Sequence, residues 1–184
     1  MGGSEVPLMI GVKTESLPPR CRPQSPVFVF AGALSRPVNA EAAELLARQV
    51  MPLVWDDLPQ ARLRIVGAGA GPAIERLAAD HRVEVVGEVP DLDAEYRSAS
   101  AVFAPTVVDA GVLIKALRGA ACEIPLILNQ SAAAPIGLVD GVHAVVGESP
   151  SDLARGAVRL VREPAWAAAM AARAREHVRV TYSW

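Results

Sequence analysis

Cysteine, signal-peptide features and long apolar runs are all scarce or absent in this chain of 184 residues. The two cysteines, Cys21 and Cys122, lie far apart in unlike surroundings, which predicts neither a disulfide framework nor a cysteine metal site. No apolar run approaches the roughly 18 residues that span a bilayer, and the opening MGGSEVP lacks a signal peptide's basic start and apolar middle. These absences predict a cytoplasmic protein without a transmembrane segment.

An excess of charge of one sign is missing as well. The chain carries 18 Lys and Arg against 20 Asp and Glu, for a net charge of -2. Nucleic-acid readers usually show a concentrated basic face, so no nucleic-acid partner is predicted. Aromatic residues make up 4% of a sequence that is 52% hydrophobic, which indicates a core of Ala, Val and Leu. No cluster of metal-ligating residues or Ser/His/Asp arrangement has the spacing that such a site needs.

The most informative stretch of the sequence is residues 101–130. A short apolar run at 101–104 ends at Pro105, a turn of small residues follows to Gly111, helical spacing continues to Ala120, and residues 126–128 form a second apolar run. This pattern indicates a βαβ unit in a parallel sheet that is covered on both faces. Ligands of such sheets bind beyond the carboxyl ends of the strands, so the turn at 106–111 is a candidate site.

The rest of the chain repeats the alternation of strand and helix. Further strands are predicted at 27–30, 63–66, 83–86 and 143–146, and Asn39 is predicted to cap a first helix that Pro52 brings to an end. We therefore expect an α/β fold, a doubly wound parallel sheet of about six strands with helices on both faces. Residues 27–184 would form this Rossmann-like domain, and residues 1–26 a leader and an interdomain linker.

A glycine-rich turn, GAGAG at residues 67–71, follows the second predicted strand. Strand, glycines and helix start could seat a phosphate on free backbone N–H groups, and Glu88 lies at about the distance of a ribose-binding acid, which leaves a dinucleotide-dependent oxidoreductase open. However, Pro72 stands where the third glycine of that motif belongs. The other interpretations are a structural tight turn and a loop that lines a nucleotide cleft.

Several short segments of the sequence are informative when they are taken together. They are FAG (30–32), NAEA (39–42), Pro59 with LRIVGAG (63–69), VGEV (86–89) with Asp91, Leu92 and Tyr96, AP (104–105), GVLIKAL (111–117), DGVH (140–143) and YSW (182–184). In this order and spacing they resemble the C-terminal, donor-binding half of a GT-B glycosyltransferase of the group 1 (family 4) kind.

The resemblance implies transfer of a sugar from a nucleoside diphosphate to an acceptor in glycan or polysaccharide biosynthesis. It also implies retention of anomeric configuration, and no metal or cofactor besides the nucleotide-sugar substrate. The acceptor would be held by an N-terminal domain that this chain lacks. The chain would then be an excised domain or a natural half-enzyme, inactive alone, whose parent could contact a membrane peripherally.

The resemblance also assigns roles to particular residues. Lys115 would neutralise the departing diphosphate, and the turn at Glu88 and Val89 would face the nucleobase. The remaining candidates for contacts with the donor are glycines and other residues of the turns: Gly32, Arg36, Gly67, Gly69, Gly111 and Val112.

The sequence departs from the family pattern at several of these positions. Arg118 stands where the family usually has a glutamate, although an arginine could take over a phosphate contact. Asp109 is the only candidate for the partner acid of that glutamate. Ala33 replaces a frequent arginine, for which Arg36 could substitute. These departures motivate a second hypothesis, a catalytically degenerate relative that serves as a binding or scaffolding module.

Overall fold

The computed structural model describes residues 23–107 and 113–182. Six parallel strands form one sheet in the order β3-β2-β1-β4-β5-β6. The order reverses between β1 and β4, so the chain winds outward in both directions from the middle of the sheet, as predicted. The predicted leader and linker, residues 1–26, lie mostly outside the described residues.

The strands are short and the helices connect them in sequence. In chain order the elements are β1 (Val27–Ala31), α1 (Pro37–Leu45), a π-helical segment (Leu46–Val50), α2 (Met51–Asp57), β2 (Arg62–Val66), α3 (Pro72–Glu75), a 3-10 turn (Arg76–Ala79), β3 (Val83–Gly87), α4 (Leu92–Arg97), β4 (Ala101–Phe103), α5 (Ile114–Ala121), β5 (Leu126–Leu128), α6 (Gln130–Ala133), a 3-10 turn (Ala134–Ile136), β6 (Val145–Val146), α7 (Pro150–Arg162) and α8 (Pro164–Tyr182).

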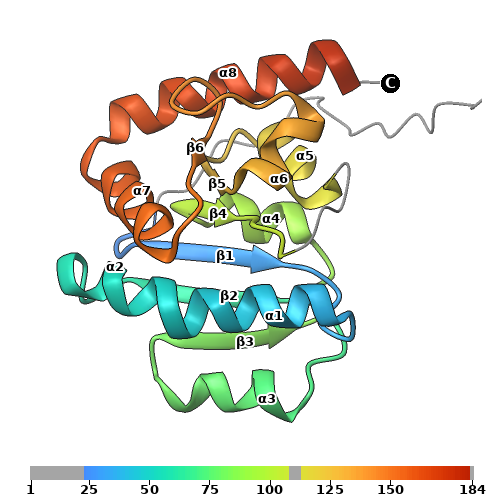
Figure 1. The fold of residues 1–184 in the computed structure, drawn as a ribbon, viewed down its shortest axis with the longest axis vertical. Coiled ribbons are helices and arrows are strands. Elements are labelled where there is room, and N and C mark those ends of the chain that lie inside the picture. The colour runs from blue at the N-terminus through green and yellow to red at the C-terminus, as the bar shows by residue number, and fades with distance from the viewer. Residues whose placement is uncertain (1–22, 108–112, 183–184) are drawn as a thin grey trace, which may run out of the picture.

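Two apolar cores lie on opposite faces of the sheet. Helices α1, α2, α3 and α7 cover one face and pack on strand residues such as Phe28 and Phe30. Helices α4, α5 and α6 cover the other face, where Val29 and Val102 point. Helix α8 joins the two layers, because its early residues belong to the first core and its later residues to the second. Figure 1 shows α1 and α2 in front of the sheet, α4 behind it and α8 across the top.

The first helical region corrects two predictions. Arg36, not Asn39, is the residue that precedes α1, and it makes no side-chain capping hydrogen bond. Pro37 occupies the first turn of α1 because its fixed φ suits that position. Pro52 also begins a segment and does not end one, since α2 continues to Asp57 after the π-helical segment. Proline is tolerated at the first or second position of a helical segment, because the N–H that it lacks would have no partner within that segment.

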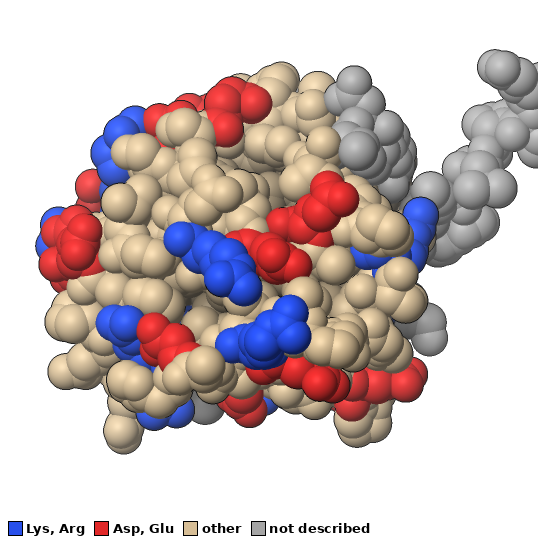
Figure 2. Space-filling model, turned by 60° about the horizontal axis from the view of Figure 1, so that its bottom comes forward, with Lys and Arg blue, Asp and Glu red and all other residues tan. Residues whose placement is uncertain are grey.

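Other helix starts follow their local sequence. Asp91 caps α4, its carboxylate accepting the Ala94 N–H at 2.9 Å. Ser149 and Asp152 form a capping box at the start of α7. Among the described residues, none of the helices has the length and apolar character to cross a membrane. Figure 2 shows acidic and basic side chains interspersed on the face that it presents.

Candidate functional site

The loops that follow β1, β2 and β3 are joined to one another at the carboxyl edge of the sheet. The Gly32 N–H donates to the Val66 carbonyl at 2.9 Å, and the Leu34 N–H donates to the Ala68 carbonyl at 2.8 Å. The Gly67 N–H in turn donates to the Gly87 carbonyl at 2.7 Å. Backbone therefore meets backbone across three adjacent strand ends, and this half of the edge is a preorganised surface.

The glycine-rich turn depends on the absence of side chains. Gly67 has φ +147°, and a Cβ there would lie 1.8 Å from the Gly32 carbonyl oxygen. Gly69 has φ +79°, and its Cβ would lie 2.8 Å from the Ser35 Cβ. Both residues thus allow the β2 loop to lie against the β1 loop. The structural tight turn accounts for these contacts, and a lining role in a nucleotide cleft stays a prediction.

Lys115 reaches this surface from the first turn of α5. Its Nζ donates to the Asn39 Oδ1 at 2.8 Å and lies 4.4 Å from the centroid of the Phe30 ring. The same Asn39 donates from Nδ2 to the Ala33 carbonyl at 3.0 Å. One buried amide therefore connects the ammonium of α5 to the loop after β1, over 76 residues of sequence.

The Lys115 ammonium is half-buried and has an uncharged acceptor. Burial, with the nearby positive charge of Arg36 acting in the same direction, lowers the pKa of Lys115 from its ordinary 10.5 to about 8. Desolvation disfavours the charged form, and a neutral amide or an aromatic face compensates only in part. An anion placed beside this ammonium would therefore find a cation that lacks a charged partner among the described residues.

Asn39 is a residue of the candidate site whose contacts the sequence analysis predicted wrongly. An asparagine near the start of a helix is typical of an N-cap, which is why a capping role was predicted. In the structure it is the third residue of α1, only 9% exposed, and its side chain points to the loop and to Lys115. A helix that begins with Pro37 was the available signal, because proline favours the first helical position.

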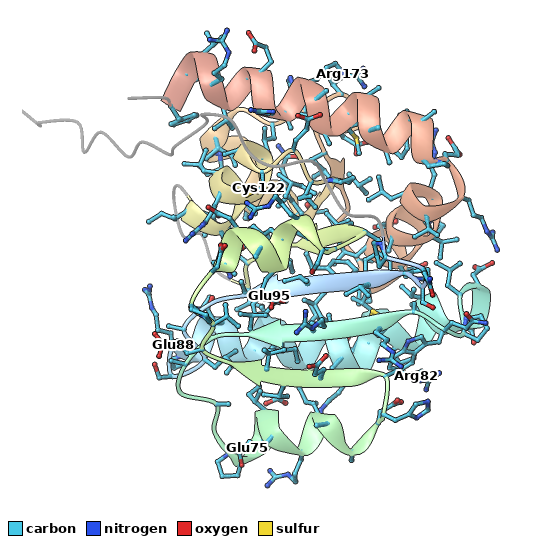
Figure 3. The ribbon with its side chains drawn as sticks, turned by 180° about the vertical axis from the view of Figure 1, so that it is seen from behind. Glu75, Arg82, Glu88, Glu95, Cys122 and Arg173 are labelled. Carbon is cyan, nitrogen blue, oxygen red and sulfur yellow. The ribbon has the colours of Figure 1, made fainter. Side chains whose placement is uncertain are left out.

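The other predicted residues fall into three groups. Arg36 and the neighbouring Ala33 are exposed on the loop after β1, close to the Lys115 site. Glu88 is exposed just after the carboxyl end of β3, whereas Arg82 lies at the amino end of that strand (Figure 3). Val89 is partly buried and packs against the second core. The third group, Asp109, Gly111 and Val112, lies outside the described residues.

Arg118, one turn after Lys115, points to a different neighbour. Its Nε donates to the Asp93 Oδ1 of α4 at 2.5 Å, and the two side chains are 41% and 34% exposed. Asp93 also accepts from the Cys122 thiol at 3.5 Å. Burial, with Asp93 adding to it, raises the pKa of that thiol to about 12, so Cys122 is an unreactive thiol. Within residues 23–107 and 113–182, three or more metal-ligating side chains do not gather anywhere.

Comparison with known proteins identifies a family. The family model described as "Glycosyl transferases group 1" matches residues 25–163. A curated relative from Corynebacterium glutamicum, a "GDP-mannose-dependent monoacylated alpha-(1-6)-phosphatidylinositol monomannoside mannosyltransferase", is 33% identical over 148 residues, which are 74% of this chain and 39% of that protein. A "D-inositol 3-phosphate glycosyltransferase" from Nocardiopsis dassonvillei is 32% identical over 91 residues, 48% of this chain and 21% of that protein.

Solved structures with the same fold come from more distant proteins. HepE of Anabaena, in complex with UDP and glucose, aligns with a TM-score of 0.72 at 15% identity, over 86% of this chain and 45% of that one. A TarM variant of S. aureus, in a complex that contains UDP, aligns with a TM-score of 0.75 at 15% identity, over 94% of this chain and 36% of that one. The chain thus spans less than half the length of each of these proteins.

Proposed function

The chain belongs to the group 1 glycosyltransferases, and from this premise we propose that it is a domain that binds the nucleoside diphosphate sugar donor. In the whole protein, a sugar would pass from this donor to an acceptor held by an N-terminal domain. Glycan or polysaccharide biosynthesis is the setting we propose, with retention of anomeric configuration and without a metal. The isolated domain would bind nucleotide but would not turn over.

The observation that carries the proposal is the position of the Lys115 ammonium. It lies beside the glycine loop after β1, at the edge where parallel sheets bind ligands. Lys115 is also the second residue of α5, where free backbone N–H groups and the helix dipole favour anions. A diphosphate that approaches Gly32 would therefore meet positive potential from a side chain and from a helix.

Lys115 would act on the leaving group. When the bond between the sugar and the diphosphate breaks, negative charge on the departing oxygen increases, and an ammonium that is already in place stabilises that charge. Its partly desolvated surroundings strengthen the attraction compared with water. We propose Asp109 as a second catalytic residue, and Gly111 and Val112 as residues that contact the donor.

The test is calorimetric titration of the chain with GDP, UDP and ADP. GDP comes first because the C. glutamicum relative is named as GDP-mannose-dependent, and UDP second because HepE and TarM were solved with it. We expect saturable binding of one nucleotide, weakened by Lys115→Ala. Binding that Lys115→Ala leaves untouched would place the donor elsewhere on the sheet.

The degenerate module is the second candidate, and the Arg118–Asp93 ion pair favours it. Asp93 engages the guanidinium at the position where the family usually has a glutamate. A folded chain that binds none of the three nucleotides would support this candidate. Recovery of activity on Arg118→Glu in the two-domain parent would support it further, whereas a parent that is active with Arg118 would exclude it.

A further inference from the structure

We infer that Asn39 is a positioning residue that holds the Lys115 ammonium against the loop after β1, and that a nucleoside diphosphate binding there brings a proton to Lys115 at alkaline pH. The inference rests on the proposed function, because it assumes that a diphosphate occupies this edge of the sheet. It adds a residue that acts through Lys115 and a coupling between donor binding and protonation.

The two hydrogen-bond partners of the Asn39 side chain determine which end of its amide is the nitrogen and which is the oxygen. Nδ2 must be the end that faces Ala33, because a backbone carbonyl only accepts. Oδ1 is therefore the end that faces Lys115, and it accepts one ammonium hydrogen. Gly32 permits this close packing, since a Cβ at that position would lie 2.8 Å from the Asn39 Cγ. The amide is fixed in the orientation that aims Lys115 at the loop.

The groups around Lys115 hold its charge weakly. Helix α1 contributes the neutral Asn39, β1 contributes the Phe30 ring, and the loop between them contributes the positive charge of Arg36. No carboxylate of the described residues forms an ion pair with Lys115. Relative to the described residues, an incoming diphosphate would add the first full negative charge beside this ammonium, and it would favour the charged form.

The direction of the pH effect follows from linkage. The pKa of Lys115 is about 8 in the free chain, and a bound diphosphate raises it. Below about pH 8 the ammonium is already present and the affinity is constant. Above about pH 8, Lys115 must take up a proton when the nucleotide binds. The affinity then falls by up to about tenfold per pH unit, until the pH reaches the Lys115 pKa of the complex. Titration in buffers of different ionisation enthalpy measures the proton directly.

Two nearly isosteric variants separate positioning from packing. Asn39→Asp places a carboxylate beside the ammonium, which raises the Lys115 pKa. The break in the affinity profile, which is the pH above which nucleotide affinity begins to fall, therefore moves to higher pH. Asn39→Leu removes the acceptor, which lowers the pKa further, so the break moves to lower pH. At neutral pH, Asn39→Leu should also weaken nucleotide binding by about tenfold, the usual effect of losing a hydrogen bond to a charged group.

The experiment uses whichever of GDP, UDP and ADP binds in the first titration, from about pH 7 to about pH 9. Lys115→Met is the matched control, because it keeps the stem and has no proton to take up, so any remaining pH dependence belongs to the nucleotide. Breaks that shift in the same direction in both Asn39 variants, or no proton uptake by the unmodified chain, would overturn the inference. Absence of nucleotide binding would instead reject the proposed function. Circular dichroism confirms that each variant is folded.

Discussion

The Lys115 ammonium of α5 meets a neutral amide and an aromatic ring, whereas the Arg118 guanidinium, one turn later in the same helix, meets the Asp93 carboxylate. The two cations are three residues apart and are both partly exposed. We call the first region the Lys115 flank, formed by Lys115, Asn39, Phe30 and the loops at Gly32 and Gly67. The second is the Arg118 flank, formed by Arg118, Asp93, Tyr96 and Cys122.

The difference lies in how each flank balances charge. Asp93 neutralises Arg118 within the fold, and the guanidinium in turn helps to lower the pKa of Asp93 against the effect of burial. Among the described residues, the Lys115 flank has no such internal balance, and its loops pack closely at Gly32 and Gly67, where a Cβ would meet neighbouring atoms. A region that leaves a cation uncompensated is suited to an external anion, and a region that pairs its cation is suited to holding α4 on α5.

The largest effect is expected from breaking the backbone of the Lys115 flank. Gly67→Ala puts a Cβ 1.8 Å from the Gly32 carbonyl oxygen at a φ of +147°. Both loops must then move, which we expect to lower the free energy of unfolding by about 3 kcal/mol or more. Chemical denaturation measures the loss, and nucleotide titration of any folded fraction should show weaker binding.

Gly71→Ala is the matched control in the same turn. A Cβ at Gly71 meets no atom within 4 Å, and this residue has an ordinary negative φ as the cap of α3. Its effect on stability should stay within about 0.5 kcal/mol. Equal losses in the two variants would mean that the turn tolerates no side chain at all, and that the contact with Gly32 is not the cause.

The next effect compares the two cations directly. Lys115→Met should weaken nucleotide binding by about ten- to a hundredfold, because an uncompensated, partly desolvated charge is lost. Arg118→Met should weaken it by at most about fivefold, since Asp93 already neutralises that side chain and exposed ion pairs contribute little. Calorimetry on both variants measures the ratio. A larger effect at Arg118 would reverse the roles of the two flanks.

The sequence predicted the layers of the fold better than the contacts of the site. Apolar runs such as 126–128 mark buried parallel strands because no polar residue can occupy either face, and they agree with the observed β5. Prolines were less informative, since Pro52 can end one segment or begin the next and only the neighbouring turns decide.

The site could be predicted only in part, for a physical reason. Lys115 was predicted from the resemblance that residues 111–117 bear to the family, and such a resemblance rests on a local stretch of sequence. Its partnership with Asn39 is not local, because two side chains 76 residues apart meet only after β1 and β4 have paired. The pairing of Arg118 with Asp93 is of the same kind, over 25 residues.

The smallest effect is expected from a change in the Arg118 flank, and it tests whether the polar groups of that flank are all paired. Tyr96 is completely buried, and its hydroxyl has no hydrogen-bond partner in the described part of the chain. Removing an unsatisfied buried hydroxyl should relieve its desolvation cost, so Tyr96→Phe should raise the free energy of unfolding by about 1 kcal/mol. Tyr182→Phe is the control, because that exposed hydroxyl makes only a 3.5 Å contact with the Pro135 carbonyl. A loss of stability in Tyr96→Phe would mean that an ordered water satisfies the hydroxyl, and that the Arg118 flank is as fully paired in its polar groups as in its charges.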